Sequence, residues 1–236
     1  MKLQAENSKL LIMKKHLTIL GLSLLGTISA FAQMPPDVPD AKAKSILDEV
    51  SKKTKSYTTI KAEFAIITVD AKGKTTDNTT GTMWHKGCNY KLELKGQTVY
   101  CDCKTQWTYI KDDNTVQIND APDPNKSENI NPSNIFTIYE KNFKYKFEKE
   151  EVQNGVAVYI VNLYPLVPGK KPYHTVKLTI DKAKSQIISV KVLNKDGTST
   201  TINVKSFTPN TDMPDSFFQW NDAEHKGVEK EDLRDH

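Results

Sequence analysis

The side chains that most often perform chemistry are sparse in this sequence and do not form a known catalytic pattern. No two of the five histidines stand at the i, i+4 spacing of a helical metal site, and no HExxH pattern occurs. Asp112 and Asp113 precede Asn114 between two predicted strands, which is typical of a turn rather than of a catalytic carboxylate pair. The acidic run 120–123 is stiffened by Pro122 and lacks the twelve-residue EF-hand pattern. We therefore predict no catalytic residue, no metal and no cofactor.

The three cysteines lie close together in the sequence and support one structural prediction. If Lys95-Gly96 forms a two-residue hairpin, residues at equal distances from this turn face each other. Tyr90 is then opposite Cys101, and Cys88 is opposite Cys103. An exported protein can oxidise such a pair, so we expect a Cys88–Cys103 disulfide and a buried free thiol at Cys101. Three reduced thiols are the alternative.

The N-terminal region has the order of parts of a secretory signal peptide. A basic stretch at 13–16 is followed by an apolar run at 17–28 and by small residues at 30 and 32. The apolar run is shorter than the roughly 20 residues that cross a bilayer, so a permanent anchor is the weaker interpretation. We expect residues 1–32 to be removed, with 1–12 reflecting a start assigned too far upstream, and residues 33–236 to form one exported domain.

The charge distribution argues against nucleic-acid binding. The formal net charge of the chain is +4, but the first 32 residues carry four lysines against one glutamate, or +3 of this total. Only +1 remains on the expected mature chain. Binding to phosphates requires lysine and arginine to be concentrated on the folded domain, so we predict no nucleic-acid partner.

The residue pattern of the mature chain predicts one helix followed by many strands. Apolar residues three and four apart predict an amphipathic helix over 40–57, with Asp40 as its N-cap. From Thr58 to Ser206 the period changes to two, and turn sequences such as Lys95-Gly96 separate about eleven strands of an antiparallel meander. A second helix is predicted over 132–141, and the charged tail after Thr208 is predicted to be mobile.

Such a sheet must cover its apolar face with only two predicted helices. It can close into a barrel or curl around the helices, and both arrangements tend to leave an apolar concavity suited to a ligand. A fully packed core without a cavity is the alternative, and the residue pattern alone does not decide between them.

Several segments resemble the outer-membrane lipoprotein carrier family, LolA. The segments 81–86 (GTMWHK) and 102–109 (DCKTQWTY) are similar to the family patterns G-x-L-W-x-K and D-G-K-T-x-W-x-Y. The order of parts is also similar, from signal peptide and amphipathic helix to a mid-chain helix after Asn131-Pro132-Ser133. Each motif is weak alone, but the resemblance covers most of the mature chain.

This resemblance implies a mainly β fold, an incomplete, half-open antiparallel barrel covered by a lid of helices. It implies a periplasmic, monomeric carrier, not an enzyme, that shields the acyl chains of lipoproteins. Its partners would be acylated lipoproteins, an inner-membrane lipoprotein-releasing transporter and an outer-membrane acceptor. The residues expected to line the acyl-chain cavity are Phe64, Ile66, Tyr90, Leu92 and Leu94 of the sheet and Ile135, Phe136 and Tyr139 of the lid.

Two departures from the family pattern leave alternatives open. Where the pattern continues with an arginine that ties the lid shut, this chain has Lys86-Gly87, and an ammonium lacks the planar fork of a guanidinium. The glycine of D-G-K-T is replaced by Cys103. A carrier-like fold that binds another lipid or hydrophobic ligand, or only a protein, is therefore the second hypothesis. An exported enzyme that uses a half-barrel cleft is the third.

Overall fold

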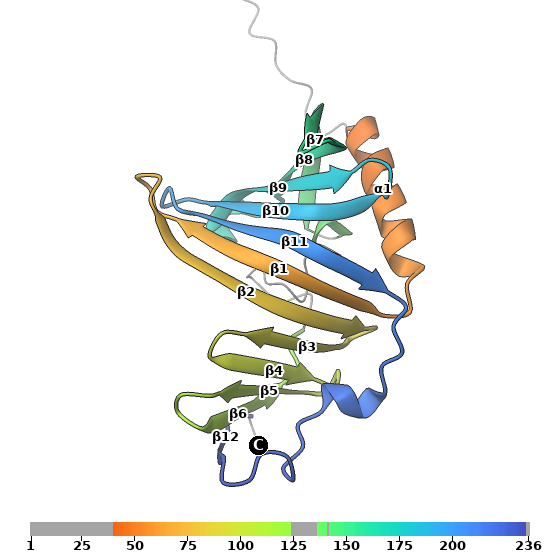
Figure 1. The fold of residues 1–236 in the computed structure, drawn as a ribbon. Helices are drawn as coiled ribbons and strands as arrows, with labels where there is room; N and C mark the ends of the chain where they lie inside the picture. Colours follow the sequence, from red (N-terminus) through yellow and green to blue (C-terminus); the bar gives the residue numbers. More distant parts are fainter. Residues whose placement is uncertain (1–39, 124–135, 141, 235–236) are drawn as a thin grey trace, which may run out of the picture. The chain divides into compact units, whose positions relative to one another are not determined.

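The computed structural model describes residues 40–123, 136–140 and 142–234. These residues form one α-helix, three short 3-10 helices and one large sheet (Figure 1). The helices are α1 Ala41–Lys55, η1 Ile138–Glu140, η2 Pro168–Lys170 and η3 Asp215–Phe218. The strands are β1 Ile60–Val69, β2 Thr75–Lys86, β3 Asn89–Leu94, β4 Gln97–Cys101, β5 Thr105–Ile110, β6 Thr115–Asp120, β7 Phe143–Gln153, β8 Val156–Pro165, β9 Tyr173–Asp181, β10 Gln186–Asn194, β11 Ser199–Pro209 and β12 Glu229–Asp232.

The sheet has twelve strands in the order β12-β6-β5-β4-β3-β2-β1-β11-β10-β9-β8-β7. Neighbouring strands are antiparallel except β12, which pairs with β6 in parallel. Within the described residues the edge strands β12 and β7 do not pair with each other, so the sheet is not closed into a barrel. The predicted incomplete antiparallel barrel is thereby confirmed, with one strand more than the eleven expected.

The predicted first helix is present as α1. Asp40 caps it, since its Oδ1 accepts a hydrogen bond from the Ala43 amide at 2.9 Å, and Lys52, Lys53 and Lys55 occupy its last turn. The other oxygen of Asp40 accepts from the Phe147 amide of β7 at 2.9 Å. The Ala43 and Phe147 N–H groups lower the pKa of Asp40 below its ordinary value. One carboxylate thus both starts the helix and attaches it to the sheet.

The face of the sheet on which α1 packs, called the inner face below, carries the hydrophobic core. Ala43, Leu47 and Val50 of α1 are buried there. The buried residues contributed by the strands are Ile60, Ala62, Phe64, Met83, Leu92, Val99, Val161, Leu163, Tyr173, Val176, Leu178, Ile180, Ile187, Val190, Val192 and Ile202. A run of apolar side chains therefore extends across the inner face from β4 to β8.

The β3–β4 hairpin has the register predicted from Lys95-Gly96. Tyr90 pairs with Cys101, and Leu94 pairs with Gln97. Cys88 and Cys103 form a disulfide, and Cys101 is a free, buried cysteine. The two-residue turn places residues 88 and 103 side by side beyond the ends of the paired strands, where their side chains can meet.

The C-terminal segment, residues 210–232, contains contacts that its charged sequence did not predict. It leaves β11, forms η3 and ends as β12 on the β6 edge (Figure 1). Its Phe218 is fully buried, and Phe217 and Trp220 contact Trp84 and Tyr100 on the opposite, outer face of β2–β4. The high content of charged residues concealed these aromatic anchors, which order the segment by burial.

The predicted second helix is described only in part, because residues 132–135 and 141 lie outside the described residues. Residues 136–140 form a turn and the 3-10 helix η1. Among the described helices, none has the length and apolar character needed to cross a bilayer.

Candidate functional site

The predicted sheet residues of the acyl-chain site all lie in one hydrophobic cluster on the inner face. Phe64 and Leu92 are buried, and Ile66, Tyr90 and Leu94 are partly buried against them. Strand pairing explains this proximity, because β1 pairs with β2 and β2 pairs with β3. The even spacing of these residues on β1 and β3 then directs their side chains to the same face.

Gly81 allows the rings and methyl groups of this cluster to approach the sheet. It lies between Phe64 of β1 and Leu94 of β3 in the strand pairing. A Cβ atom at position 81 would lie 2.6 Å from the Glu93 carbonyl oxygen and 2.7 Å from Cζ of Phe64. The glycine of the G-x-L-W-x-K segment therefore has a packing role that its sequence context alone did not reveal.

The predicted lid residues that the structure describes also reach the cluster. Phe136 and Tyr139 are buried, whereas Ile135 lies outside the described residues. Phe136 packs edge-on against Phe207 of β11, with ring centroids 5.5 Å apart. Burial, with a smaller contribution from Glu140, raises the pKa of Tyr139 well above its ordinary value. Tyr139 is therefore a neutral phenol at physiological pH.

Glu140 attaches this segment to α1, a contact that the sequence analysis missed. Its Oε1 accepts a hydrogen bond from Ser51 Oγ at 2.8 Å and lies 2.8 Å from Lys55 Nζ. Lysines in the last turn of the helix are explained by the helix dipole alone, so the sequence did not indicate this contact. Residues 136–140 are thus held to the helix by polar contacts and to the sheet by aromatic packing.

Three surface grooves border α1. The first, of about 530 Å³, lies beside Lys53 and Tyr57 near the C-terminal end of the helix. A second, of about 290 Å³, lies between α1 and Tyr139, and a third, of about 210 Å³, lies between α1 and the β9–β10 turn. The core under the helix is therefore packed, and open space borders the helix on several sides.

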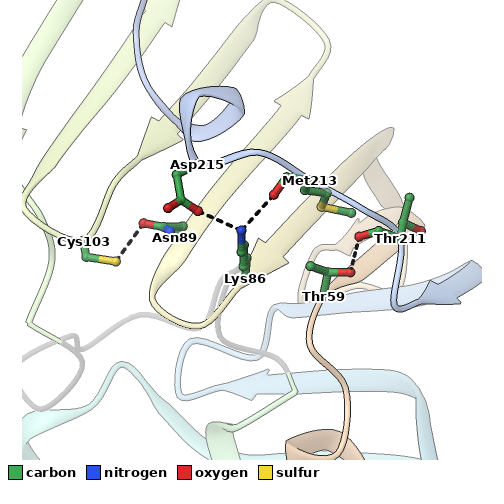
Figure 2. A network of polar contacts seen from close by, with 7 residues as sticks. All are labelled: Thr59, Lys86, Asn89, Cys103, Thr211, Met213 and Asp215. Atoms are coloured by element: carbon green, nitrogen blue, oxygen red, sulfur yellow. Dashed lines mark hydrogen bonds and ion pairs between the residues drawn. The ribbon is translucent and has the colours of Figure 1, made fainter.

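Lys86, which stands before the missing family arginine, contacts the C-terminal segment instead of the predicted lid. Its Nζ donates hydrogen bonds to the Met213 carbonyl oxygen at 2.9 Å and to Asp215 Oδ1 at 2.8 Å (Figure 2). Nearby, Thr59 Oγ1 donates to the Thr211 carbonyl oxygen at 2.6 Å. The lysine thus ties the start of the C-terminal segment to β2, and no part of this network involves residues 136–140.

The described residues offer no metal-binding group. They contain no cluster of three or more histidine, cysteine or carboxylate side chains that could hold a metal ion. His85 faces the inner side of β2 opposite Ile60, and burial lowers its pKa below the ordinary value. What the arrangement offers chemically is apolar contact, with polar groups at its border.

The fold and this apolar face agree with a comparison against protein families. Residues 55–221 match the family model described as outer membrane lipoprotein carrier protein LolA. The chain belongs to the LolA family. The match spans more than half of the sequence and confirms the resemblance drawn from the two β-strand motifs. Among curated protein sequences, none matches this LolA-family chain at a significant level.

Solved structures similar to this chain have low sequence identity. An uncharacterized conserved protein from Thermus thermophilus has a TM-score of 0.56 at 14% identity, covering 81% of this chain and 99% of its own. A LolA superfamily protein from Nitrosomonas europaea has a TM-score of 0.38 at 13% identity, covering 78% and 99%. The lipoprotein LppX from Mycobacterium tuberculosis has a TM-score of 0.43 at 10% identity, covering 74% and 98%. The first score indicates a shared fold, whereas scores below 0.5 do not by themselves establish one.

Proposed function

We propose that this LolA-family protein is a periplasmic carrier, not an enzyme, that shields lipoprotein acyl chains between the inner and outer membranes. The observation that supports this most strongly is the family match over residues 55–221, which include strands β1 to β11, together with the apolar inner face under α1. The donor would be an inner-membrane lipoprotein-releasing transporter, and the recipient an outer-membrane acceptor. The carrier would act as a monomer after loss of residues 1–32.

The free-energy cost of moving acyl chains through water without a carrier is large. Each methylene exposed to water costs about 0.8 kcal/mol, so a triacylated polypeptide does not leave a membrane unprotected. A carrier must also release its cargo, which favours non-directional apolar contacts over tight polar recognition. The inner-face residues Phe64, Ile66, Tyr90, Leu92 and Leu94 meet this requirement, with Ile135, Phe136 and Tyr139 completing the proposed lining.

Access to this lining requires α1 and residues 136–140 to move, because Phe64, Leu92 and Phe136 are already buried. Among the polar contacts of these segments, those of Glu140 with Ser51 and Lys55 lie at positions open to solvent. Exposed ion pairs contribute only about 0–1 kcal/mol each. We propose that acyl chains take the place of part of the packed core as these segments separate from the sheet.

Native mass spectrometry with lipid extraction tests the proposal on the exported protein purified from its own periplasm without detergent. Acylated polypeptides in stoichiometric amounts are expected, and more of them when the outer-membrane acceptor is depleted. Repeated absence of acylated polypeptide under acceptor depletion would contradict the proposal.

Two neighbouring residues of β1 provide matched variants. Ile66 is packed against the inner-face cluster, whereas Ile67 is half-buried on the other side of the strand. Ile66→Gln adds a polar group to the proposed lining and is expected to reduce acylated cargo, while Ile67→Gln leaves it unchanged. Equal loss in both variants would indicate a general folding defect, and equal retention would remove Ile66 from the lining.

A second candidate function is binding of a different lipid or hydrophobic ligand. The observation that favours it is Lys86, which is engaged by the C-terminal segment and leaves the predicted lid without the family latch. Recovery of free phospholipid or fatty acid alone in the same experiment would select this function.

A further inference from the structure

The groove beside the C-terminal end of α1 lies where two neighbouring strands separate. β10 and β11 are paired from Ser189–Asn203 to Leu193–Ser199, and no pairing extends beyond Ser189 and Asn203 toward the start of β10. Residues Gln186 and Ile188 of β10 and Val204–Phe207 of β11 instead line the groove of about 530 Å³. The two strands therefore separate at this point, called the strand fork below, and the ladder of backbone hydrogen bonds between them ends.

A β-bulge in each strand shapes this fork. Ile188 is the extra residue where the β10–β9 register shifts, and Lys205 is the extra residue where the β11–β1 register shifts. Both extra residues line the groove. Bulges re-aim side chains and are frequent next to binding sites. Here the bulge allows consecutive residues of β11 to border one groove, which the alternation of a regular strand would prevent.

The lining combines an apolar surface with positive charge. Tyr57, Val204 and Phe207 are partly buried and pack against the core. Three lysines border this surface: Lys53, Lys184 and Lys205. No acidic residue is among the described residues that line the groove, and the carboxylate nearest to one of these lysines is Asp181, 3.8 Å from Lys184 Nζ. The other two grooves along α1 each contain carboxylates, Glu49 and Asp181 in one and Asp48 and Glu140 in the other.

We infer that the β10–β11 fork is a binding site for an anionic amphiphile, with its acyl chain on Tyr57, Val204 and Phe207 and its negatively charged head between Lys53 and Lys205. The shared chemistry is an anionic head on a hydrocarbon chain, whether the head is a carboxylate or a phosphate. This inference goes beyond the carrier proposal, because a lipoprotein's acylated terminus does not itself require a cluster of lysines. The site shares Phe207 with the packing of Phe136, but its lysines are not part of the proposed acyl-chain lining.

Fluorescence titration of the exported protein with cis-parinaric acid tests the site, with the methyl ester of the same acid as the uncharged comparison. We expect saturable binding of the acid and at least roughly fivefold weaker binding of the ester, as expected for loss of two partly screened ion pairs. Lysophosphatidic acid is expected to displace the probe if a phosphate head is also accepted, and failure to do so assigns the site to carboxylates. Inorganic phosphate, which has no chain, is expected not to displace it.

Variants then locate the binding. Lys53→Gln/Lys205→Gln is expected to weaken the acid roughly three- to tenfold. Lys72→Gln/Lys74→Gln, which makes the same charge change in the exposed β1–β2 turn, is expected to have no effect. Ser206→Trp, at an exposed groove position, is expected to block binding while the thermal unfolding midpoint is retained.

Equal affinities for acid and ester, equal effects of the two lysine pairs, or no binding of either probe would each overturn the inference. Equal affinities or equal lysine effects leave the carrier proposal standing, because the inner face would bind an acyl chain with or without a charged head. Absence of binding of both probes would count against both proposals, and the cargo analysis by mass spectrometry then decides on the carrier. Conversely, a protein that carries no acylated polypeptide can still bind the probe in this groove, so the two failures are distinguishable.

Discussion

The two faces of the sheet bury apolar side chains in different ways. On the inner face, aliphatic and aromatic residues extend from β4 to β8 in the sheet order, α1 packs on them, and grooves border the helix. On the outer face of β2–β6, the C-terminal segment covers a smaller, mainly aromatic cluster formed by Trp84, Tyr100, Tyr109, Phe217, Phe218, Trp220 and His225. The outer cluster is mainly aromatic, whereas the inner face combines many aliphatic side chains with ring pairs such as Phe136–Phe207.

The polar contacts of the C-terminal segment and of α1 also differ. The C-terminal segment is held by the Lys86–Asp215 ion pair, by a hydrogen bond from Asn114 Nδ2 to the Gly227 carbonyl oxygen, and by the β12–β6 ladder. Lys91 also lies 4.7 Å from the centroid of the Phe217 ring, within cation–π range. The C-terminal segment also adds a strand to the sheet, whereas α1 packs on the sheet and is attached by side-chain contacts such as Asp40 with the Phe147 amide. A segment that forms part of the sheet suits a structural role, whereas a helix that packs on the sheet suits displacement by a ligand. The following predictions test this difference.

The largest effect is expected from Phe218, the fully buried anchor of the outer cluster. Phe218→Ala should destabilise the protein by about 3–5 kcal/mol through lost burial and a residual cavity. Chemical denaturation measures the change, with Leu233→Ala, at a position that is 47% exposed, as the control of small effect. A loss below 1 kcal/mol would mean that the C-terminal segment contributes little to the fold.

The Cys88–Cys103 disulfide is expected to contribute somewhat less. It closes a loop with a sequence separation of 15, for which chain-entropy arguments give about 3 kcal/mol. Adding reductant should lower the unfolding midpoint of the natural protein but not that of Cys88→Ser/Cys103→Ser. A midpoint that does not respond to reductant in the natural protein would show that the bond is absent or without effect.

His85 should make stability depend on pH at the border of the inner face. Burial lowers the pKa of His85 in the folded state, so the unfolded chain binds a proton more readily. Stability is therefore fully present above the unfolded value near 6.5 and is lost as pH falls from there toward the lower folded value. His85→Gln should remove this part of the profile between pH 5 and 7, as measured by denaturation at several pH values. If the pH dependence of stability is unchanged in this variant, groups other than His85 cause it.

The smallest effect is expected from the Lys86–Asp215 ion pair, whose side chains are 37% and 73% exposed. Asp215→Asn should cost less than about 1 kcal/mol, and less at high salt, because exposed pairs are weakly coupled and screened. A double-mutant cycle with Lys86→Met measures the coupling. A coupling of several kcal/mol would mean that Lys86 acts as a true latch of the C-terminal segment.

The sequence predicted the parts of the fold that depend on local patterns. The helix with its Asp40 cap, the β3–β4 register and the positions of Cys88, Cys101 and Cys103 follow from side-chain period and turn chemistry, and the structure has each of them. Predictions that depend on long-range partners were weaker. The sequence after Thr208 is rich in charged residues, which do not indicate burial. Phe218 is buried because the segment packs on the outer face of the sheet.

The candidate site could also be predicted only in part from the sequence. Alternation predicted which residues of β1 and β3 share a face, and the structure brings Phe64, Leu92 and Leu94 together. The contacts of Glu140 and the strand fork at Lys205 were not predictable, because they depend on register shifts and on residues distant in sequence. Whether the inner face exchanges its packing for acyl chains is a property that no residue pattern encodes, and it stays a prediction.

The most direct test of the central claim is photo-crosslinking with a triacylated lipopeptide that carries a photoreactive group in one acyl chain, followed by mapping of the labelled peptides. The account predicts labels on inner-face residues of β1 and β3, such as Ile66, Leu92 and Leu94, and on α1 or residues 136–140. Labels concentrated on the outer cluster around Trp220, or no specific labelling of a protein that binds the lipopeptide, would contradict it.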